Sequence, residues 1–256
     1  MADDNRPIKY LRYAIGEIIL VVIGILIALQ INDWNEVKKN YHIERAFFTD
    51  VLDDIEKDRT EMTNIIKFYD NRIEQLGWLL NKLRHPNQPI DILEFGEHTE
   101  PLYYNMPPIS YSSAFESAKS SGTFEKIKNK ELLKILTQYY TEFSEVNALL
   151  TSTIRIIESQ LEPIMATIPE NYIQISSRSN VISINQKDNN LFYQYLSEIG
   201  DARDITIDLK SFLQKPEVEN YIIGDLGRSF NSNSNIYSRL EFLEDIEKTI
   251  KYYLDD

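Results

Sequence analysis

Apolar side chains dominate the chain between residues 14 and 31. This stretch reads AIGEIILVVIGILIALQI, and 12 of its 18 residues are Ile, Leu or Val. As an α-helix it would be about 27 Å long, which matches the hydrocarbon core of a bilayer. The apolar residues favour membrane insertion by roughly 5 kcal/mol, whereas the one carboxylate, Glu17, opposes it by about 3 kcal/mol. The pattern therefore predicts a transmembrane helix.

A buried core helix and a cleavable signal peptide both fit this stretch less well. A core helix of a soluble domain is rarely apolar around its whole circumference. A signal peptide has a shorter apolar run and a small-residue cleavage site, and no such site follows here. Aromatic rings prefer the membrane–water interface, and Tyr10, Tyr13 and Trp34 flank the span as interface anchors.

After the span, apolar residues recur at alternating steps of four and three. Ten of eleven such positions between residues 48 and 83 are apolar, and no Pro or Gly lies in residues 35–76. This heptad repeat, the pattern of coiled coils, is typical of a long helix packed along one seam, and the helix can run on directly from the span. We expect it to end near His85, because the residue before Pro86 disfavours the α conformation. The seam positions are Phe48, Leu52, Ile55, Arg59, Met62, Ile66, Tyr69, Ile73, Leu76, Leu80 and Leu83.

The rest of the chain predicts further helices separated by short irregular segments. Residues 86–111 hold five of the nine prolines and indicate a loop. Gly122 is expected to end a short helix, Pro163 to end a second long one, and the polar residues 231–235 to cap the last one. Two short strands are predicted within residues 164–190, and a break is predicted near Gly200. The expected helices are residues 112–121, 130–161, 191–213, 217–226 and 236–254.

These elements define an all-α fold class. A single N-terminal transmembrane helix is followed by an elongated antiparallel helical bundle with long heptad-patterned helices. The predicted division is a short tail (1–13), the transmembrane helix (14–31) and an extramembrane bundle domain (32–256).

Charge and composition exclude several classes of function. The net charge of −13 lies entirely after residue 31, because residues 1–31 carry three basic and three acidic side chains. An acidic domain of this kind is not expected to bind nucleic acid. With no cysteine, the chain cannot form disulfides, Cys-ligated zinc sites or a thiol nucleophile.

The sequence contains no motif that carries catalysis, a cofactor or a metal. The three histidines have no partner at helical metal-ligand spacing, and Glu97-His98 falls in the predicted loop. The GxxG pattern at Gly224 is too weak to indicate RNA binding. Six acids between residues 50 and 61 are expected on a solvated helix face, because carboxylates that radiate from a helix cannot converge on Ca²⁺.

Two charged residues interrupt apolar patterns. Arg59 occupies a seam position, where it needs a carboxylate on a facing helix, forms a pocket for an anion, or marks a locally exposed seam. Glu17 shares one helix face with Gly24, Ala28 and Ile31, and small residues at such a face allow another helix to approach closely. The alternative is that Glu17 only reaches towards Arg12 and the lipid headgroups.

Two blocks of the chain resemble a family of uncharacterised single-span bacterial membrane proteins, which share a domain of unknown function. The first block is residues 9–36, KYLRYAIGEIILVVIGILIALQINDWNE, and the second is residues 114–140, AFESAKSSGTFEKIKNKELLKILTQYY. The resemblance implies the inner membrane of a Gram-negative cell, and it brings no activity, cofactor or catalytic residue. The first block is specific because Gly16, Glu17, Gly24, Gln30, Asn32 and Trp34 all fall in the pattern.

The orientation is predicted from basic residues near the span. Three cations lie on each side, but those before the span are closer to it, and a long following domain translocates largely regardless of its charge. We therefore expect a cytoplasmic N-terminus and a periplasmic bundle.

The leading hypothesis is a non-enzymatic scaffold, adaptor or accessory subunit of a membrane complex. Its expected partners are the lipid bilayer and either another copy of the chain or another membrane protein. The alternatives are an extracytoplasmic bundle that senses a ligand and an ion- or proton-coupled subunit that uses Glu17.

Overall fold

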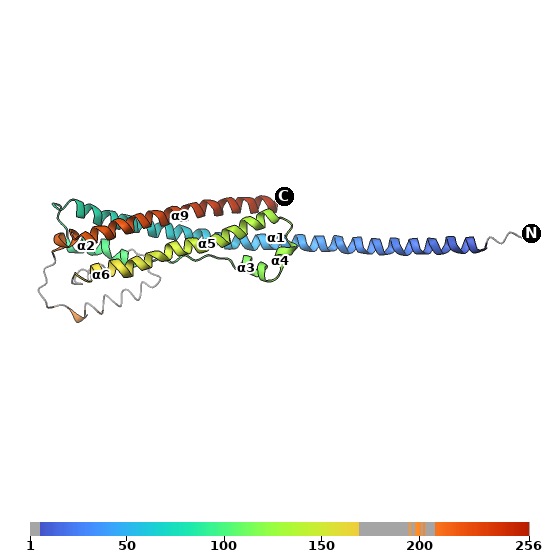
Figure 1. The fold of residues 1–256 in the computed structure, drawn as a ribbon, viewed down its shortest axis with the longest axis horizontal. Coiled ribbons are helices and arrows are strands. Elements are labelled where there is room, and N and C mark those ends of the chain that lie inside the picture. Colours follow the sequence, from blue (N-terminus) through green and yellow to red (C-terminus); the bar gives the residue numbers. More distant parts are fainter. Residues whose placement is uncertain (1–5, 169–194, 196–197, 201, 203–207, 256) are drawn as a thin grey trace, which may run out of the picture.

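The computed structural model describes residues 6–168, 195, 198–200, 202 and 208–255. Within these residues the chain is all helical and contains no strand (Figure 1). The fold class predicted from the sequence is confirmed. The elements are α1 (Arg6–Arg84), α2 (Ile92–Thr99), η1 (Glu100–Tyr103), α3 (Ser113–Ser120), α4 (Thr123–Lys126), α5 (Lys130–Ile156), the π-helical η2 (Ile157–Leu161), α6 (Glu162–Met165), α8 (Leu209–Leu213) and α9 (Pro216–Asp255).

Helix α1 joins the apolar N-terminal stretch to the bundle without a break. It contains 79 residues, which corresponds to a length of about 118 Å. Every residue from 13 to 39 is exposed, and the most apolar window of α1 has a mean hydropathy of 2.6 with none of its residues buried. A core helix of a soluble domain would instead be mostly buried. Among the described residues, α1 is the one helix long and apolar enough to cross a membrane.

The second half of α1 packs against α9, and side chains of α1 also contact α5 directly. Helix α9 runs antiparallel to α1, and the C-terminus lies where α1 leaves the bundle (Figure 1). The Arg45 side chain of α1 donates a hydrogen bond to the backbone carbonyl of Leu254 at this point. The result is an elongated bundle with an apolar helix projecting from one end.

The bundle contains two hydrophobic clusters that follow each other along its axis. The cluster nearer the projecting helix ends on α1 at Tyr69, and the distal cluster begins on α1 at Leu76. The polar residues between the two clusters are buried, and they come from all three long helices. They are Arg72 of α1, Thr153 of α5, and Asp225, Ser229, Ser232 and Asn233 of α9. We call these six residues the polar layer.

The predicted division of α9 into two helices is wrong. Residues 231–235 lie inside one continuous helix of 40 residues and do not cap a new one. Asn233 faces α1 and donates to Asp70 Oδ1 over 2.7 Å, while Asn235 donates to the carbonyl of Asn231 over 2.8 Å. Because these amides find partners on α1 or on α9 itself, they do not compete with the backbone hydrogen bonds of α9.

Two further boundaries differ from the prediction. Residues 86–111 contain α2 and η1, because Asp91 caps α2 by accepting the N–H groups of Leu93 and Glu94, and Phe95 is buried in the distal cluster. Pro163 does not end the second long helix, because helical backbone continues from α5 through the π-helical η2 into α6, where Pro163 stands in the first turn. The two predicted strands and most of the predicted helix 191–213 lie outside the described residues.

Other boundaries agree with the sequence. Helix α1 ends at Arg84, just before His85-Pro86, and α3 is followed by Gly122. Gly122 has a φ of 73°, a left-handed conformation that glycine adopts without steric cost.

Replacing Leu76 by Asp should destabilise the bundle strongly. Leu76 is fully buried in the distal cluster, so the new carboxylate would lose its hydration without gaining a partner. We expect the free energy of unfolding to fall by about 3–5 kcal/mol, measured by urea denaturation of the full chain in detergent. The matched control Asn81→Asp places the same group on an exposed position of α1 and should change stability little. Equal stabilities of the two variants would show that Leu76 is not a core residue.

Candidate functional site

The proposed association face on the apolar half of α1 is not covered by any described part of the chain. Glu17, Gly24, Ala28 and Ile31 are all exposed, and the space over Gly24 is open to beyond 4 Å. Within the described part of the chain, no group packs on this face.

The aromatic residues Tyr13 and Trp34 flank the apolar stretch, one at each end. Tyr13 and Trp34 are 79% and 65% exposed, and the helix between them is about 32 Å long. That separation matches the thickness of a bilayer's hydrocarbon core. Tyr10 belongs to α1, but its side chain lies outside the described part of the structure.

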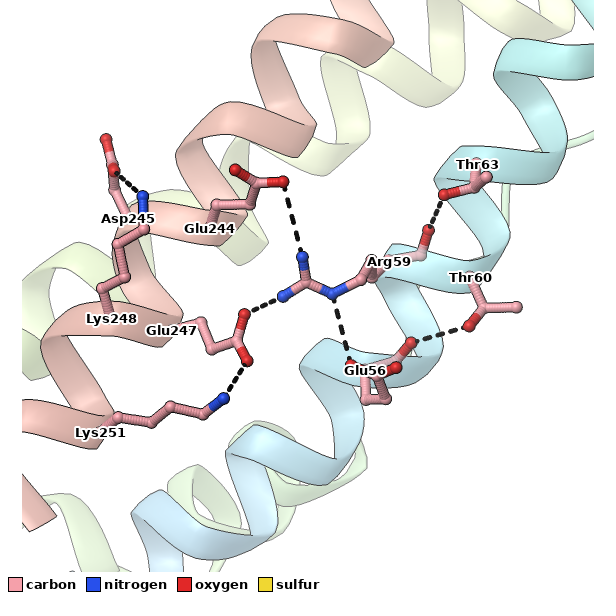
Figure 2. Close-up of polar contacts among 9 residues, drawn as sticks. All are labelled: Glu56, Arg59, Thr60, Thr63, Glu244, Asp245, Glu247, Lys248 and Lys251. Atoms are coloured by element: carbon pink, nitrogen blue, oxygen red, sulfur yellow. Dashed lines mark hydrogen bonds and ion pairs between the residues drawn. The ribbon is translucent and has the colours of Figure 1, made fainter.

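Arg59 lies at the edge of the seam between α1 and α9 and is surrounded by carboxylates (Figure 2). Its Nη2 donates to Glu247 of α9, and its Nη1 lies 3.6 Å from Glu244 of the same helix. Its Nε donates to Glu56, one turn earlier on α1, over 3.3 Å. The side chain is 26% exposed. The structure thus places Arg59 in a partly exposed ion-pair network that joins α1 to α9, with its charge already paired by protein carboxylates.

The polar layer contains a second arginine, which is fully paired. Arg72 donates through Nε and Nη2 to the two carboxylate oxygens of Asp225, over 3.1 and 2.6 Å, and through Nη1 to the carbonyl of Leu102 over 2.9 Å. The Tyr221 hydroxyl donates to the same carboxylate over 2.8 Å. Although burial alone would lower the pKa of Arg72, the charge of Asp225 and its hydrogen bond raise it, so the guanidinium stays charged.

Two acids of α1 hold the start of α3 and the strap, by which we mean residues 104–112 that lead into α3. Asp58 accepts hydrogen bonds from the backbone N–H of Tyr111 over 2.6 Å and from the Tyr139 hydroxyl of α5 over 2.8 Å. Asp54 accepts from the backbone N–H of Ala114 over 2.8 Å, in the first turn of α3. A carboxylate satisfies a free N–H at a helix start.

The solvated face predicted for the acidic cluster is therefore wrong in part. Asp54 and Asp58 were expected on that face, yet their exposures are 2% and 0%. A third acid, Glu44, is also buried and accepts the N–H of Asn129, the residue that caps α5. One signal was available: Asp54 and Asp58 stand one turn apart and directly precede the seam positions Ile55 and Arg59.

The surroundings of Asp58 shift the pKa of its carboxyl group. Burial raises the pKa of its carboxyl group, while the hydrogen bonds from Tyr111, Tyr139 and Ser110 and the charge of Arg239 act in the opposite direction. Burial also raises the pKa of the Tyr139 hydroxyl, so this group stays a hydrogen-bond donor to Asp58 at every physiological pH.

His98 lies on helix α2 and not in a loop as expected. Its ring stacks on Trp78 with centroids 4.1 Å apart, and its Nδ1 hydrogen-bonds to the Gln75 side chain. Burial lowers the pKa of His98, against the opposing charges of Glu94 and Glu97, so the ring is mostly neutral at pH 7. Within the described ranges, no three His, Asp or Glu side chains are grouped closely enough to hold a metal ion.

The two arginine sites should differ sharply in their contribution to stability. Asp225→Asn leaves the buried Arg72 charge without its counter-charge, so we expect a loss of about 3–5 kcal/mol in the free energy of unfolding. Arg59→Gln removes a partly exposed pair and should cost about 1 kcal/mol or less. Urea denaturation of the full chain measures both. If Arg59→Gln lowers the free energy of unfolding more than Asp225→Asn does, the polar layer does not hold the bundle together.

The raised pKa of Asp58 predicts a specific pH dependence. The folded chain binds a proton on Asp58 more tightly than the unfolded chain does, so this group adds stability at acidic pH. That contribution is lost as the pH rises from about 3.8 through the folded pKa. The stability of the native chain relative to Asp58→Asn should therefore fall over this window, as measured by urea midpoints at several pH values. The exposed neighbour Asp53→Asn is the control, and a difference that stays constant or grows with pH contradicts the prediction.

Comparison with known proteins gives a family match. No curated protein and no solved structure matches the chain. The sequence pattern of a family of unknown function, DUF6090, matches residues 17–145. That match begins inside the apolar half of α1, includes the strap, and ends within α5, so it covers half of the chain. The chain belongs to this family of unknown function, DUF6090.

Proposed function

We propose that this protein is a non-enzymatic, membrane-anchored helical protein that acts as a scaffold, adaptor or accessory subunit of a membrane complex. The observation that supports this proposal is the continuity of α1. One uninterrupted helix supplies both an apolar, unburied N-terminal half and the central element of a bundle. An anchor that is rigidly fused to a folded domain suits a protein whose task is to hold partners at a fixed place relative to a membrane.

The length of α1 also supports a spacing role. The apolar stretch ends at residue 31, and the first buried side chain of the bundle is that of Glu44. The twelve residues between them, 32–43, form a stalk of about 18 Å. This stalk would hold the acidic bundle away from lipid headgroups while keeping it in a fixed direction.

The proposed setting is a bacterial inner membrane, with the N-terminus in the cytoplasm and the bundle in the periplasm. The support is the closer approach of Arg6, Lys9 and Arg12 to the span. Labelling of Lys39→Cys with a membrane-impermeant maleimide in cells with a permeabilised outer membrane tests this orientation. Complete protection of that cysteine would place the bundle in the cytoplasm instead.

The partner in the membrane is proposed to be another copy of the chain or another membrane protein. Because nothing in the described chain covers Gly24 or Ala28, a neighbouring helix can approach there closely. Glu17 lies on the same face and would then point towards that helix instead of lipid.

Crosslinking through Ile31→Cys in native membranes tests this proposal. The chain has no native cysteine, so any disulfide must involve this position. We expect a crosslink to a second copy or to another protein, and a severalfold loss of it when Gly24→Leu adds bulk at the closest approach. Val22→Leu adds bulk on the opposite side of the helix and serves as the control.

Three outcomes separate the candidate functions. Loss of the crosslink with Gly24→Leu but not with Glu17→Gln supports a packing role. An intact crosslink with lost cellular function in Glu17→Gln supports the ion- or proton-coupled alternative. If Ile31→Cys crosslinks to no protein and none of the variants changes what co-purifies in mild detergent, the scaffold proposal is wrong.

A further inference from the structure

A groove between α5 and α9 contains an arginine that is not fully paired. The two helices lie side by side in the bundle (Figure 1). The groove has a volume of about 260 Å³. Its charged lining residues are Arg239 of α9 and Glu142 and Glu145 of α5, and its apolar lining residues include Val146, Leu149 and Phe242.

Arg239 is 6% exposed and is held in one orientation. Its guanidinium carbon lies 3.8 Å from the ring centroid of Tyr139 and 5.0 Å from that of Phe143. Its Nη1 donates to the backbone carbonyl of Tyr139 over 3.0 Å. Within the described part of the chain, Nε and Nη2 have no hydrogen-bond partner, although both are buried. Leaving two buried N–H groups of a charged side chain unpaired is unfavourable.

The unpaired Nε and Nη2 form one edge of the guanidinium. Their two N–H groups point in parallel and match the two oxygens of a carboxylate. Arg72 shows the same arrangement with a carboxylate present. Its Nη1 donates to a backbone carbonyl, while its Nε and Nη2 donate to the two oxygens of Asp225. The Arg239 edge therefore has the chemistry of a carboxylate-binding site.

The residues at the mouth and along the wall of the groove indicate which groups the ligand carries besides a carboxylate. Glu142 and Glu145 are exposed there, and their charges would repel a simple anion that approached Arg239. A ligand that carries an ammonium group beside its carboxylate turns this repulsion into attraction. The apolar lining from Val146, Leu149 and Phe242 suits an aliphatic side chain.

We propose that this groove binds a free α-amino acid with an aliphatic side chain. The ligand's carboxylate pairs with the Nε and Nη2 edge of Arg239, and its ammonium group faces Glu142 and Glu145. Because Nε and Nη2 are both buried, the side chains that cover this edge must move before the carboxylate reaches it. The inference does not rest on the scaffold role, since the groove lies in the bundle, away from the association face.

Calorimetric titration of the full chain in mild detergent tests the proposal with L-leucine as the probe. Two analogues each lack one charged group of leucine. 4-Methylpentanoate lacks the ammonium group, and isopentylamine lacks the carboxylate. We expect L-leucine to bind and each analogue to bind at least about tenfold more weakly, because each loses one charged interaction. No heat of binding with millimolar L-leucine, or equal binding of leucine and either analogue, overturns the proposal.

Variants test where the ligand binds and distinguish loss of binding from loss of folding. Arg239→Lys keeps the charge but loses the paired edge, and should weaken leucine binding at least about tenfold. Its melting temperature is measured alongside, because Arg239 is buried. The double variant Glu142→Gln, Glu145→Gln changes only exposed residues, so it should fold normally, weaken L-leucine binding and strengthen 4-methylpentanoate binding.

The control is Glu131→Gln, an exposed glutamate of α5 outside the groove, which should leave both affinities unchanged. If the double variant binds leucine as the native chain does, the ammonium group does not lie at the mouth and the proposal is wrong. Crosslinking through Ile31→Cys is scored separately, so failure of the amino-acid site and failure of the scaffold proposal remain distinguishable.

Discussion

Helix α1 combines two surfaces of opposite character along one axis. Its residues 14–31 present almost only apolar side chains, and its second half presents a seam to α9 together with buried carboxylates. The backbone hydrogen bonds are satisfied within the helix along its whole length, so no loop is needed between the two parts. As a result, the direction and rotation of the bundle relative to the apolar segment are set by the helix itself.

The same helix organises the rest of the chain through its buried charged groups. Glu44, Asp54 and Asp58 accept backbone N–H groups from the segments that start α5, α3 and the strap's end, so each return of the chain is fixed to a particular turn of α1. Arg72 and Asp225 fix the antiparallel register of α1 and α9, because a slip would leave both charges buried and unpaired. Apolar seams alone would not distinguish neighbouring registers so strongly.

The sequence predicted the parts of the fold that depend on periodicity, and it missed those that depend on contacts between distant segments. The apolar stretch, the heptad seam and the stop at Pro86 were sufficient for α1. Residues 231–235 looked like a cap because Asp70, the partner of Asn233, lies far away in the sequence. Asp54 and Asp58 looked solvated because nothing nearby in the sequence shows that the strap returns to them.

The same limit applies to the candidate sites. The position of Arg59 in the seam signals a need for a counter-charge, but the choice of Glu247 depends on the register of α9. Arg239 gives no signal in the sequence, where it is one polar residue of an ordinary helix. Its unpaired edge becomes visible only when the distances to Tyr139 and Phe143 and the contrast with Arg72 are known.

The central claim is that the apolar segment and the core of the bundle are one rigid helix. Double electron–electron resonance between spin labels at Asp33→Cys and Lys67→Cys tests this claim most directly. Both positions are exposed, and the native chain has no cysteine. In lipid nanodiscs a continuous helix predicts a single narrow distribution near 51 Å, set by about 1.5 Å per residue. A broad distribution, or one centred well below this distance, would show a hinge between anchor and bundle and would contradict the account.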